Sequence, residues 1–269
     1  MGKRKADGSK QPGKKKFKSA AKLLDPYTSG IYVTCARHKE PQCRQELMNI
    51  LSEKIPEYFD LDKVEDGEDE EKEVEKKELS VEDKIKLELE QLKESKTSKK
   101  ELLQPIEIDL ECLSFIKTKK PIDPEVLVEN ICKECYESGV KTTRYTQKLI
   151  PIMSTCSATG DDPLERLREM AKKVLARHFH QEKDQKPVKF AINVSRRNFN
   201  TLESGEIIRT VAECIGKEHG HAVDLKNYDK LIIIECYKNS IGMGVANNYL
   251  KYSKFNLQQI FEKQQESKD

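Results

Sequence analysis

The sequence predicts a mixed fold of the α+β type, within the broad α/β class, in which short strands and amphipathic helices follow one another. In short runs such as residues 31–35, apolar residues alternate with others, which is the pattern of a half-buried strand. In stretches such as residues 207–215, apolar residues recur every three or four positions and form one face of a helix. No run of eighteen apolar residues occurs, so we expect no membrane partner.

Charge separates the parts of the chain that can bury a core from those that cannot. Residues 1–22 carry nine Lys and Arg against one Asp, and residues 60–104 carry ten Lys against seventeen Asp and Glu. We predict a disordered basic tail over 1–22 and an acidic low-complexity insertion over 60–104. From residue 141 to the end there are twenty-two basic and sixteen acidic residues, a surplus that favours a polyanionic partner.

Two basic clusters in the tail, at residues 3–5 and 14–18, resemble a two-part nuclear localisation signal. We therefore expect the protein in the nucleus, and the nucleolus stays open as a more specific location. The tail could equally be an arm that attaches to RNA through charge, and the two roles are compatible.

The first predicted domain covers residues 23–137 and has a ferredoxin-like layer of strands and helices. A strand at 31–35 precedes a helix that begins near Pro41. Alternation over 106–118 predicts one strand of roughly 10 residues. Asp123 followed by Pro124 then predicts the start of a second helix.

Inside the acidic insertion, Ser80 and Asp83 resemble a capping box at the start of a helix. A narrow apolar stripe follows over residues 81–92. An exposed, partly formed helix explains this pattern, and a helix over 80–94 that docks on a partner is the alternative.

The second predicted domain covers residues 138–247 and is followed by a polar tail over 248–269. Its helices are expected to begin at Asp162 and at Ser204, which are both good N-cap residues. The strands expected in it are residues 141–155, 190–194, 222–225, 231–237 and 241–246, with a turn at Asn239-Ser240 before the last.

Cysteines and histidines form no recognisable metal or catalytic motif. Cys132 and Cys135 are the one C-x-x-C pair, whereas a structural zinc site needs four ligands. Both lie on the apolar face of the predicted helix, so we predict buried thiols, with a metal or redox site as the alternative. No phosphate-binding glycine loop or G-x-S-x-G motif occurs. We expect no catalytic residues, no metal and no cofactor.

Four segments of the C-terminal half together resemble the THUMP domain, a tRNA-binding module of thiouridine synthases, RNA methylases and pseudouridine synthases. They are FAINVSRRNFNT at 190–201, the helix after Ser204, VDLKNYD at 223–229 and LIIIE at 231–235. Three further segments are similar to the eukaryotic THUMP proteins that assist tRNA cytidine acetylation: LLDPYTSGIYVTCAR at 23–37, KTTRYTQKLIPI at 141–152 and KFNLQQI at 254–260.

The resemblance implies a non-catalytic adaptor with an N-terminal ferredoxin-like domain followed by a THUMP domain. Such an adaptor would hold serine and leucine tRNAs while an RNA cytidine acetyltransferase, which uses acetyl-CoA and ATP, modifies a cytidine of the D-arm. Its partners would be tRNA and that enzyme, with no DNA. The residues alone indicate only a basic RNA-binding protein without a visible active site. A self-sufficient RNA-modifying enzyme and a ribosome-assembly scaffold remain as alternatives.

Arg196, Arg197 and Asn198 are the leading candidates for RNA contacts, because they lie between a strand and a helix N-terminus, where backbone N–H groups favour phosphate. Both arginines can reach one phosphate backbone only if the strand ends before them. The other candidates are Lys189, Lys226, Lys230, and the pair Arg144 and Lys148, which share one face of an extended strand. The alternative is that these side chains pair with Glu203, Asp224 and Asp229.

Overall fold

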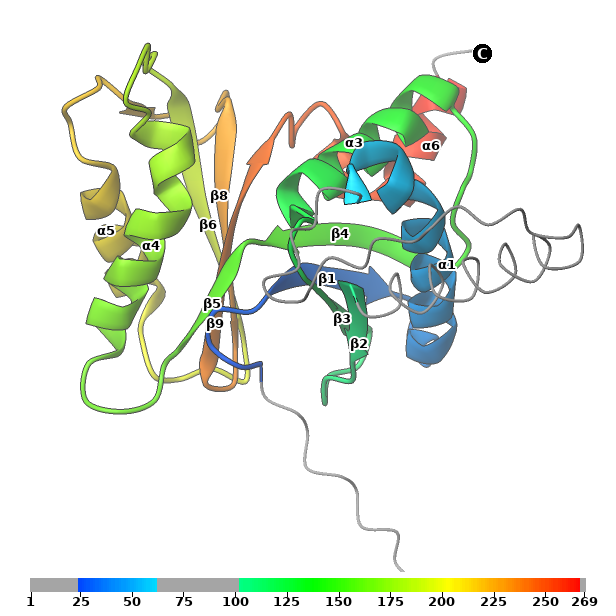
Figure 1. Cartoon of the computed structure of the whole chain (residues 1–269), viewed down its shortest axis with the longest axis horizontal. Helices are drawn as coiled ribbons and strands as arrows, with labels where there is room; N and C mark the ends of the chain where they lie inside the picture. Colours follow the sequence, from blue (N-terminus) through cyan, green and yellow to red (C-terminus); the bar gives the residue numbers. More distant parts are fainter. Residues whose placement is uncertain (1–23, 62–101, 267–269) are drawn as a thin grey trace, which may run out of the picture.

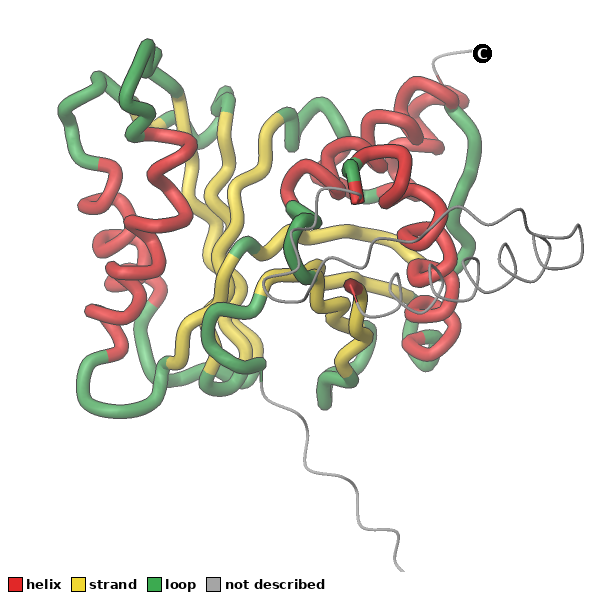
Figure 2. The backbone as a smooth tube through the Cα atoms, viewed as in Figure 1, coloured by secondary structure: helices red, strands yellow, loops and turns green. Residues whose placement is uncertain are grey.

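The computed structural model of the chain describes residues 24–61 and 102–266. The basic tail, most of the acidic insertion and the candidate helix at 80–94 lie outside these ranges. Two β-sheets lie side by side, and each is covered by its own helices (Figures 1 and 2). Within the described ranges, no helix is long and apolar enough to cross a membrane.

The first sheet has four antiparallel strands in the order β2-β3-β1-β4. Helices α1 and α3 pack on it, and their apolar residues join its core. The chain order β-α-β-β-α-β with this strand order is the ferredoxin-like pattern, which confirms the predicted architecture. The elements are β1 (Ser29–Cys35), α1 (Glu40–Tyr58), β2 (Leu103–Ile106), β3 (Leu113–Thr118), α3 (Pro124–Ser138) and β4 (Thr146–Ile152).

The single strand predicted over 106–118 is wrong, because this stretch holds the end of β2, a loop and β3. Ile108 lies in the loop but is buried in the first core, so the apolar alternation continues through a segment that is not extended. The backbone of Cys112, with φ of 62°, ends the loop just before β3. Alternation alone could not reveal this turn.

The second sheet has five strands in the order β5-β9-β8-β6-β7, in which β6 runs parallel to β7 and β8. Helices α4 and α5 cover one of its faces (Figure 1). The elements are β5 (Ser154–Ser157), α4 (Pro163–Phe179), β6 (Lys189–Arg197), α5 (Ser204–Ile215), β7 (Ala222–Val223), β8 (Lys230–Tyr237) and β9 (Ser240–Asn247).

Side-chain caps explain where the helices begin. The Asp123 carboxylate accepts hydrogen bonds from the amides of Glu125 and Val126, at 2.9 and 3.3 Å, and starts α3 as predicted. Asp162 caps α4 in the same way through the Glu165 amide, at 3.0 Å. Ser204 is not the cap of α5: Glu203 takes that position in a capping box with Glu206, which accepts the Glu203 amide at 2.9 Å.

One extended segment, residues 146–157, belongs to both sheets (Figure 1). Its first half is β4 and its second half is β5, and between them the Met153 amide donates to the Met243 carbonyl at 2.7 Å. The crossing is tight, because a Cβ on Gly244 would lie 2.2 Å from the Pro151 carbonyl oxygen. The predicted boundary at 137/138 therefore does not separate the sheets, since β4 pairs with β1.

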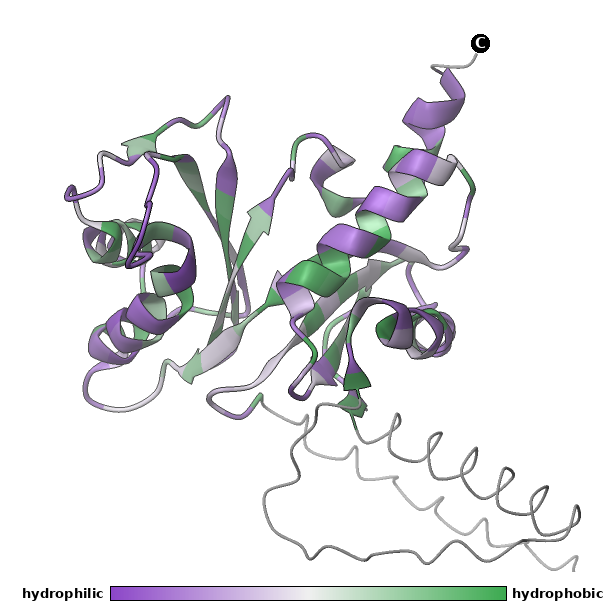
Figure 3. Cartoon of the chain, turned by 45° about the horizontal axis from the view of Figure 1, so that its top comes forward, coloured by the Kyte–Doolittle hydropathy of each residue, from purple (hydrophilic) through white to green (hydrophobic). Residues whose placement is uncertain are grey.

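The polar tail predicted over 248–269 is in the structure a folded segment that covers the first core. It contains a 3-10 turn, η2 (Ser253–Phe255), and a helix, α6 (Leu257–Glu266). Tyr252, Phe255 and Ile260 are buried in the first core. Few of its residues are apolar, so composition hides the packing, and Figure 3 shows how hydrophilic and hydrophobic residues intermix along the helices.

Candidate nucleic-acid interface

The two arginines at the end of β6 lie on opposite faces of the second sheet. The strand runs through Arg197, so the expectation that it ends before Arg196 is wrong. Its parallel partner β8 extends it, because the register pairs Arg196 with Cys236 and Arg197 with Tyr237. The chain then turns at Asn198, whose φ of 52° ends the strand.

Arg196 lies on the face that carries the helices. Its guanidinium donates to the Leu202 carbonyl at 3.0 Å and lies 3.4 Å from a carboxylate oxygen of Glu203. These contacts connect the end of β6 to the start of α5. In this conformation Arg196 shares no phosphate-binding surface with Arg197.

Arg197 lies on the helix-free face and forms an ion pair with Glu235 of β8. The Arg197 side chain is 36% exposed, whereas that of Glu235 is 6% exposed. A buried carboxylate thus holds a guanidinium that remains partly exposed to solvent.

Lys148 of β4 lies beside this ion pair, on the side of the first sheet that meets the second. Burial lowers the pKa of Lys148, and the Glu235 carboxylate partly opposes this shift. The Lys148 ammonium also lies 5.4 Å from the ring centroid of Tyr249. Two cations from different sheets, Lys148 and Arg197, therefore lie within electrostatic range of the Glu235 carboxylate.

A groove of about 360 Å³ opens where the two sheets and the C-terminal segment meet. We call it the inter-sheet groove, and its lining includes Lys148, Asn193, Tyr228, Tyr249 and Lys254. Lysines can bind phosphate oxygens, and aromatic rings can stack on unpaired bases. The groove combines both chemistries on a face with no helix.

Lys189 and Lys226 lie near the opposite end of β6 from Arg197. The Lys189 ammonium is 3.3 Å from an Asp224 carboxylate oxygen, so pairing with Asp224, the alternative for this residue, occurs. The other Asp224 oxygen accepts from the amides of Lys226 and Asn227, at 3.0 and 2.8 Å. These amides lower the pKa of Asp224 and fix the loop, from which the Lys226 side chain is exposed.

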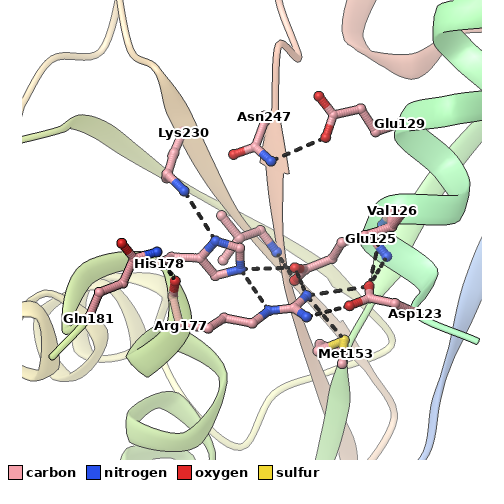
Figure 4. Close-up of polar contacts among 11 residues, drawn as sticks. Asp123, Glu125, Val126, Glu129, Met153, Arg177, His178, Gln181, Lys230 and Asn247 are labelled. Carbon is pink, nitrogen blue, oxygen red and sulfur yellow. Dashed lines mark hydrogen bonds and ion pairs between the residues drawn. The ribbon is translucent and has the colours of Figure 1, made fainter. Parts of the chain in front are cut away.

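The last two candidates lie away from the groove. The Lys230 ammonium is 3.2 Å from Nδ1 of His178, in a buried polar network (Figure 4). Arg144 precedes β4, so the prediction that it shares a strand face with Lys148 is wrong. The Glu46 carboxylate accepts the backbone N–H groups of Arg144, at 2.6 Å, and of the next two residues, which keeps this stretch out of the strand.

Sequence reasoning missed Asn193, Tyr228, Tyr249 and Lys254 as groove residues. Asn193 could have been found, because strand alternation places it on the same face as Arg197. Lys254 could not, since it belongs to a segment predicted as a tail. Only the tertiary fold, including a bridge between Lys148 and Asn256, brings that segment to β4.

Six of the eight thiols are poor candidates for nucleophiles, because they are buried. Cys132 and Cys135 are buried, as predicted, and burial raises the pKa of both. Burial also raises the pKa of Cys35, Cys156 and Cys236 to about 12, so their thiolate forms are scarce at neutral pH. In the described ranges, no three or more His, Cys, Asp or Glu residues are placed to hold a metal ion.

Comparison with known proteins adds a family match and relatives that are similar over more than nine-tenths of this chain. Residues 163–246 match the THUMP domain family. A Saccharomyces cerevisiae protein named tRNA acetyltransferase TAN1 is 45% identical over 266 residues, which cover 93% of this chain and 90% of that protein. THUMP domain-containing protein 1 of Bos taurus is 27% identical over 94% of this chain and 71% of its own length.

Proposed function

This chain belongs to the family of THUMP domain-containing proteins, and from that we propose that it is a tRNA-binding adaptor for tRNA acetylation. Its task would be to present tRNA to a separate RNA cytidine acetyltransferase. The observation that carries the proposal is the inter-sheet groove, with its lysines and aromatic rings, in a chain similar along nearly its whole length to a protein named for tRNA acetylation.

The groove would supply affinity through phosphate contacts and stacking, while the chemistry takes place on the partner enzyme. Lys148, Arg197 and Lys254 would bind phosphate oxygens, and Tyr228 would offer a ring to an unpaired base. A tRNA held next to the enzyme reacts at a high effective concentration, which is how an adaptor without catalytic residues can accelerate acetylation. Serine and leucine tRNAs, with a cytidine of the D-arm as acceptor, are the specific substrates proposed.

The name of the yeast relative suggests a second candidate function, in which this chain itself transfers the acetyl group. Transfer through a thioester would need a cysteine with an accessible thiolate. The raised pKa values of the buried thiols disfavour that route. We therefore place the acetyl transfer on the partner.

The experiment separates these two functions by mass spectrometry of nucleosides. The purified chain is incubated with tRNA, acetyl-CoA and ATP, with and without the cytidine acetyltransferase. We expect acetylcytidine only when the enzyme is present, and a decrease with the variant Lys148→Ala/Lys254→Ala but not with Lys172→Ala, a control on the exposed side of α4. Acetylcytidine formed by the chain alone would overturn the adaptor proposal.

The identity of the RNA is tested by sequencing RNA that is crosslinked to the chain in cells. Serine and leucine tRNAs should be enriched, with crosslinks at nucleotides that contact the groove. Enrichment of ribosomal RNA or its precursors would instead support the ribosome-assembly scaffold.

We also propose that the chain acts in the nucleus, on the basis of the two basic clusters in residues 1–22. Fluorescence microscopy of the chain without these residues should show loss of nuclear accumulation, while tRNA binding by the purified protein persists. A truncated chain that stays nuclear in cells that lack the acetyltransferase would contradict this location signal.

A further inference from the structure

The N-cap residue and the first half of α3 join the two sheets through three carboxylates. Asp123, Glu125 and Glu129 all point from this helix of the first sheet toward elements of the second (Figure 4). Glu129 accepts hydrogen bonds from the side-chain amides of Asn247 and Asn248, at 3.2 and 2.8 Å. These three contacts therefore cross the boundary between the sheets.

Glu125 is the centre of the network, and only 5% of the residue is exposed. One of its carboxylate oxygens accepts the Val245 amide at 2.6 Å. The other lies 2.9 Å from Nε2 of His178 and also pairs with the Arg177 guanidinium. Glu125 thus contacts β9 and the last turn of α4 at once.

The Val245 amide needs this partner because of where β5 stops. β5 pairs with β9 only as far as Met243, so Val245 lies beyond the last residue of β9 that has a strand on that side. A buried N–H group without an acceptor would destabilise the fold. The Glu125 carboxylate replaces the missing strand at this single position.

Charges of both signs surround Glu125. Arg177 pairs with Asp123 as well, and although burial would raise the pKa of Asp123, the guanidinium and two helix amides lower it. On the other side, Lys230 contacts Nδ1 of His178, and burial lowers the pKa of Lys230, opposed in part by Glu125 and Glu129. Nε2 of His178 lies between two partners, the Glu125 carboxylate at 2.9 Å and Nε of Arg177 at 3.1 Å, so the imidazole is held from both of its nitrogens.

The inter-sheet groove is divided between the same two bodies that the network joins. Lys148 belongs to the first sheet, through β4, whereas Asn193 and Tyr228 belong to β6 and the loop before β8. The apolar core also crosses the boundary, for example through Ile233. Apolar contacts are non-directional, while hydrogen bonds to a buried carboxylate fix direction.

We propose that Glu125 is a positioning residue for RNA binding: it fixes the first sheet against the second, so that Lys148 faces the groove residues of β6. The inference rests on the proposed function, since it concerns how the tRNA-binding surface is held together. Glu125 itself lies in the interior and would not touch the RNA.

A double-mutant cycle on tRNA affinity tests the proposal. Lys148→Ala is combined with Glu125→Ala, with Glu125→Gln, and with the control Glu134→Gln, a carboxylate of α3 whose ion pair with Lys54 stays within the helices of the first sheet. In the wild-type and control backgrounds, Lys148→Ala should weaken binding roughly fivefold. In the Glu125→Ala background the loss should fall below about twofold, because Lys148 is already displaced.

Glu125→Gln is the second variant, for the case that Glu125→Ala does not fold. The amide oxygen can still accept the Val245 N–H, but the charge that holds Arg177 is lost. We expect an intermediate loss from Lys148→Ala, between roughly twofold and fivefold. A fivefold loss in the folded Glu125 variants would overturn the positioning role while leaving tRNA binding intact.

Hydrogen exchange provides a readout without RNA. The Val245 amide should exchange at least about tenfold faster in the Glu125→Ala variant and at the wild-type rate in Glu134→Gln. In Glu125→Gln, whose amide oxygen can still accept the Val245 N–H, the increase should be smaller but measurable. If the exchange rate of the Val245 amide does not change in the Glu125 variants, the network is not what holds the two sheets together. A wild-type chain that fails to bind tRNA would instead refute the proposed function, and with it the role of Glu125.

Discussion

The two faces of the second sheet use neighbouring residues of β6 and β8 in opposite ways. On the helix-covered face, Ile232 and Ile234 are fully buried against α4 and α5, and Arg196 serves to join β6 to α5. On the helix-free face, Arg197 is held by Glu235 beside Lys148 and reaches solvent. The comparison shows that the face of the sheet on which a strand residue lies, and not its residue type, decides whether its side chain is available to a ligand.

The helix-free face is itself shared between two uses. Leu231, Ile233 and Ala246 pack into the core of the first sheet, and the rest borders the inter-sheet groove. The first sheet thus replaces a helix layer over part of this face and leaves a polar opening over the remainder. Substitutions on the two faces should therefore have different consequences.

The largest expected difference is between the two arginines. Arg197→Glu would place a second carboxylate against the buried Glu235, and we expect a loss of about 3–5 kcal/mol in the free energy of unfolding. Arg196→Glu, whose carboxylate neighbour Glu203 is exposed, should lose no more than about 1 kcal/mol. Urea denaturation of both variants measures the difference. Equal losses would mean that the two faces are electrostatically equivalent.

The next test concerns the closeness of the two sheets. Gly244→Ala places a methyl group 2.2 Å from the Pro151 carbonyl oxygen, and we expect a loss of about 2–3 kcal/mol. The matched control is Gly205→Ala in α5, where the added Cβ meets nothing within 4 Å. It should be neutral or stabilising by up to about 1 kcal/mol, because alanine favours helices. Thermal melts that rank the two variants in the reverse order would contradict the tight crossing.

The third test addresses RNA binding on the helix-free face. Lys148→Ala and Lys254→Ala should each weaken tRNA binding by about 1 kcal/mol and reduce the slope of log affinity against log salt by roughly 0.7–0.9. Lys172→Ala on α4 should change neither quantity, because it lies on the other side of the sheet. Fluorescence anisotropy at several salt concentrations gives both values. A larger effect of Lys172→Ala would indicate that RNA binds on the helix-covered face instead.

The smallest expected effect is the uptake of a fraction of a proton when tRNA binds. Burial lowers the pKa of Lys148 in the folded protein. The fold is therefore most stable above the ordinary lysine pKa of about 10.4, where Lys148 is neutral in both the folded and the unfolded state, and this stability is lost as pH falls through the lowered value. A bound phosphate would raise the pKa again. Between the two values, tRNA binding should take up a fraction of a proton, measured by titration calorimetry in buffers of different ionisation enthalpy. If the Lys148→Ala variant still takes up the proton on tRNA binding, a group other than Lys148 is protonated.

Local signals were sufficient to predict most of the elements but not where β6 ends. The caps Asp123 and Asp162, each followed by proline, mark helix starts through bonds to their own neighbours, so sequence reveals them. The end of β6 depends on its pairing with β8, some forty positions later, and no residue near Arg196 reports that register. The strand continues as far as its hydrogen bonding to the partner strand continues.

The groove was harder to predict because it is assembled from distant segments. Lys148, Asn193, Tyr228 and Lys254 come from four parts of the chain, so no spacing in the sequence connects them. The two predicted arginines were adjacent, and adjacency in a strand means separation in space. The sequence was sufficient to predict which residues share a strand face. It was not sufficient to predict that the C-terminal segment folds against that face.

The segment shared by β4 and β5 has a consequence for how the molecule comes apart. A strand that is hydrogen-bonded into two sheets transmits the loss of one sheet directly to the other, so the chain should melt as one cooperative unit and not as two independent domains. A fragment cut to residues 163–246 would lack β5 and leave the edge of β9 bare, open to pairing with other chains. Although each sheet has its own helices, neither is a module that can be removed by cutting the chain once.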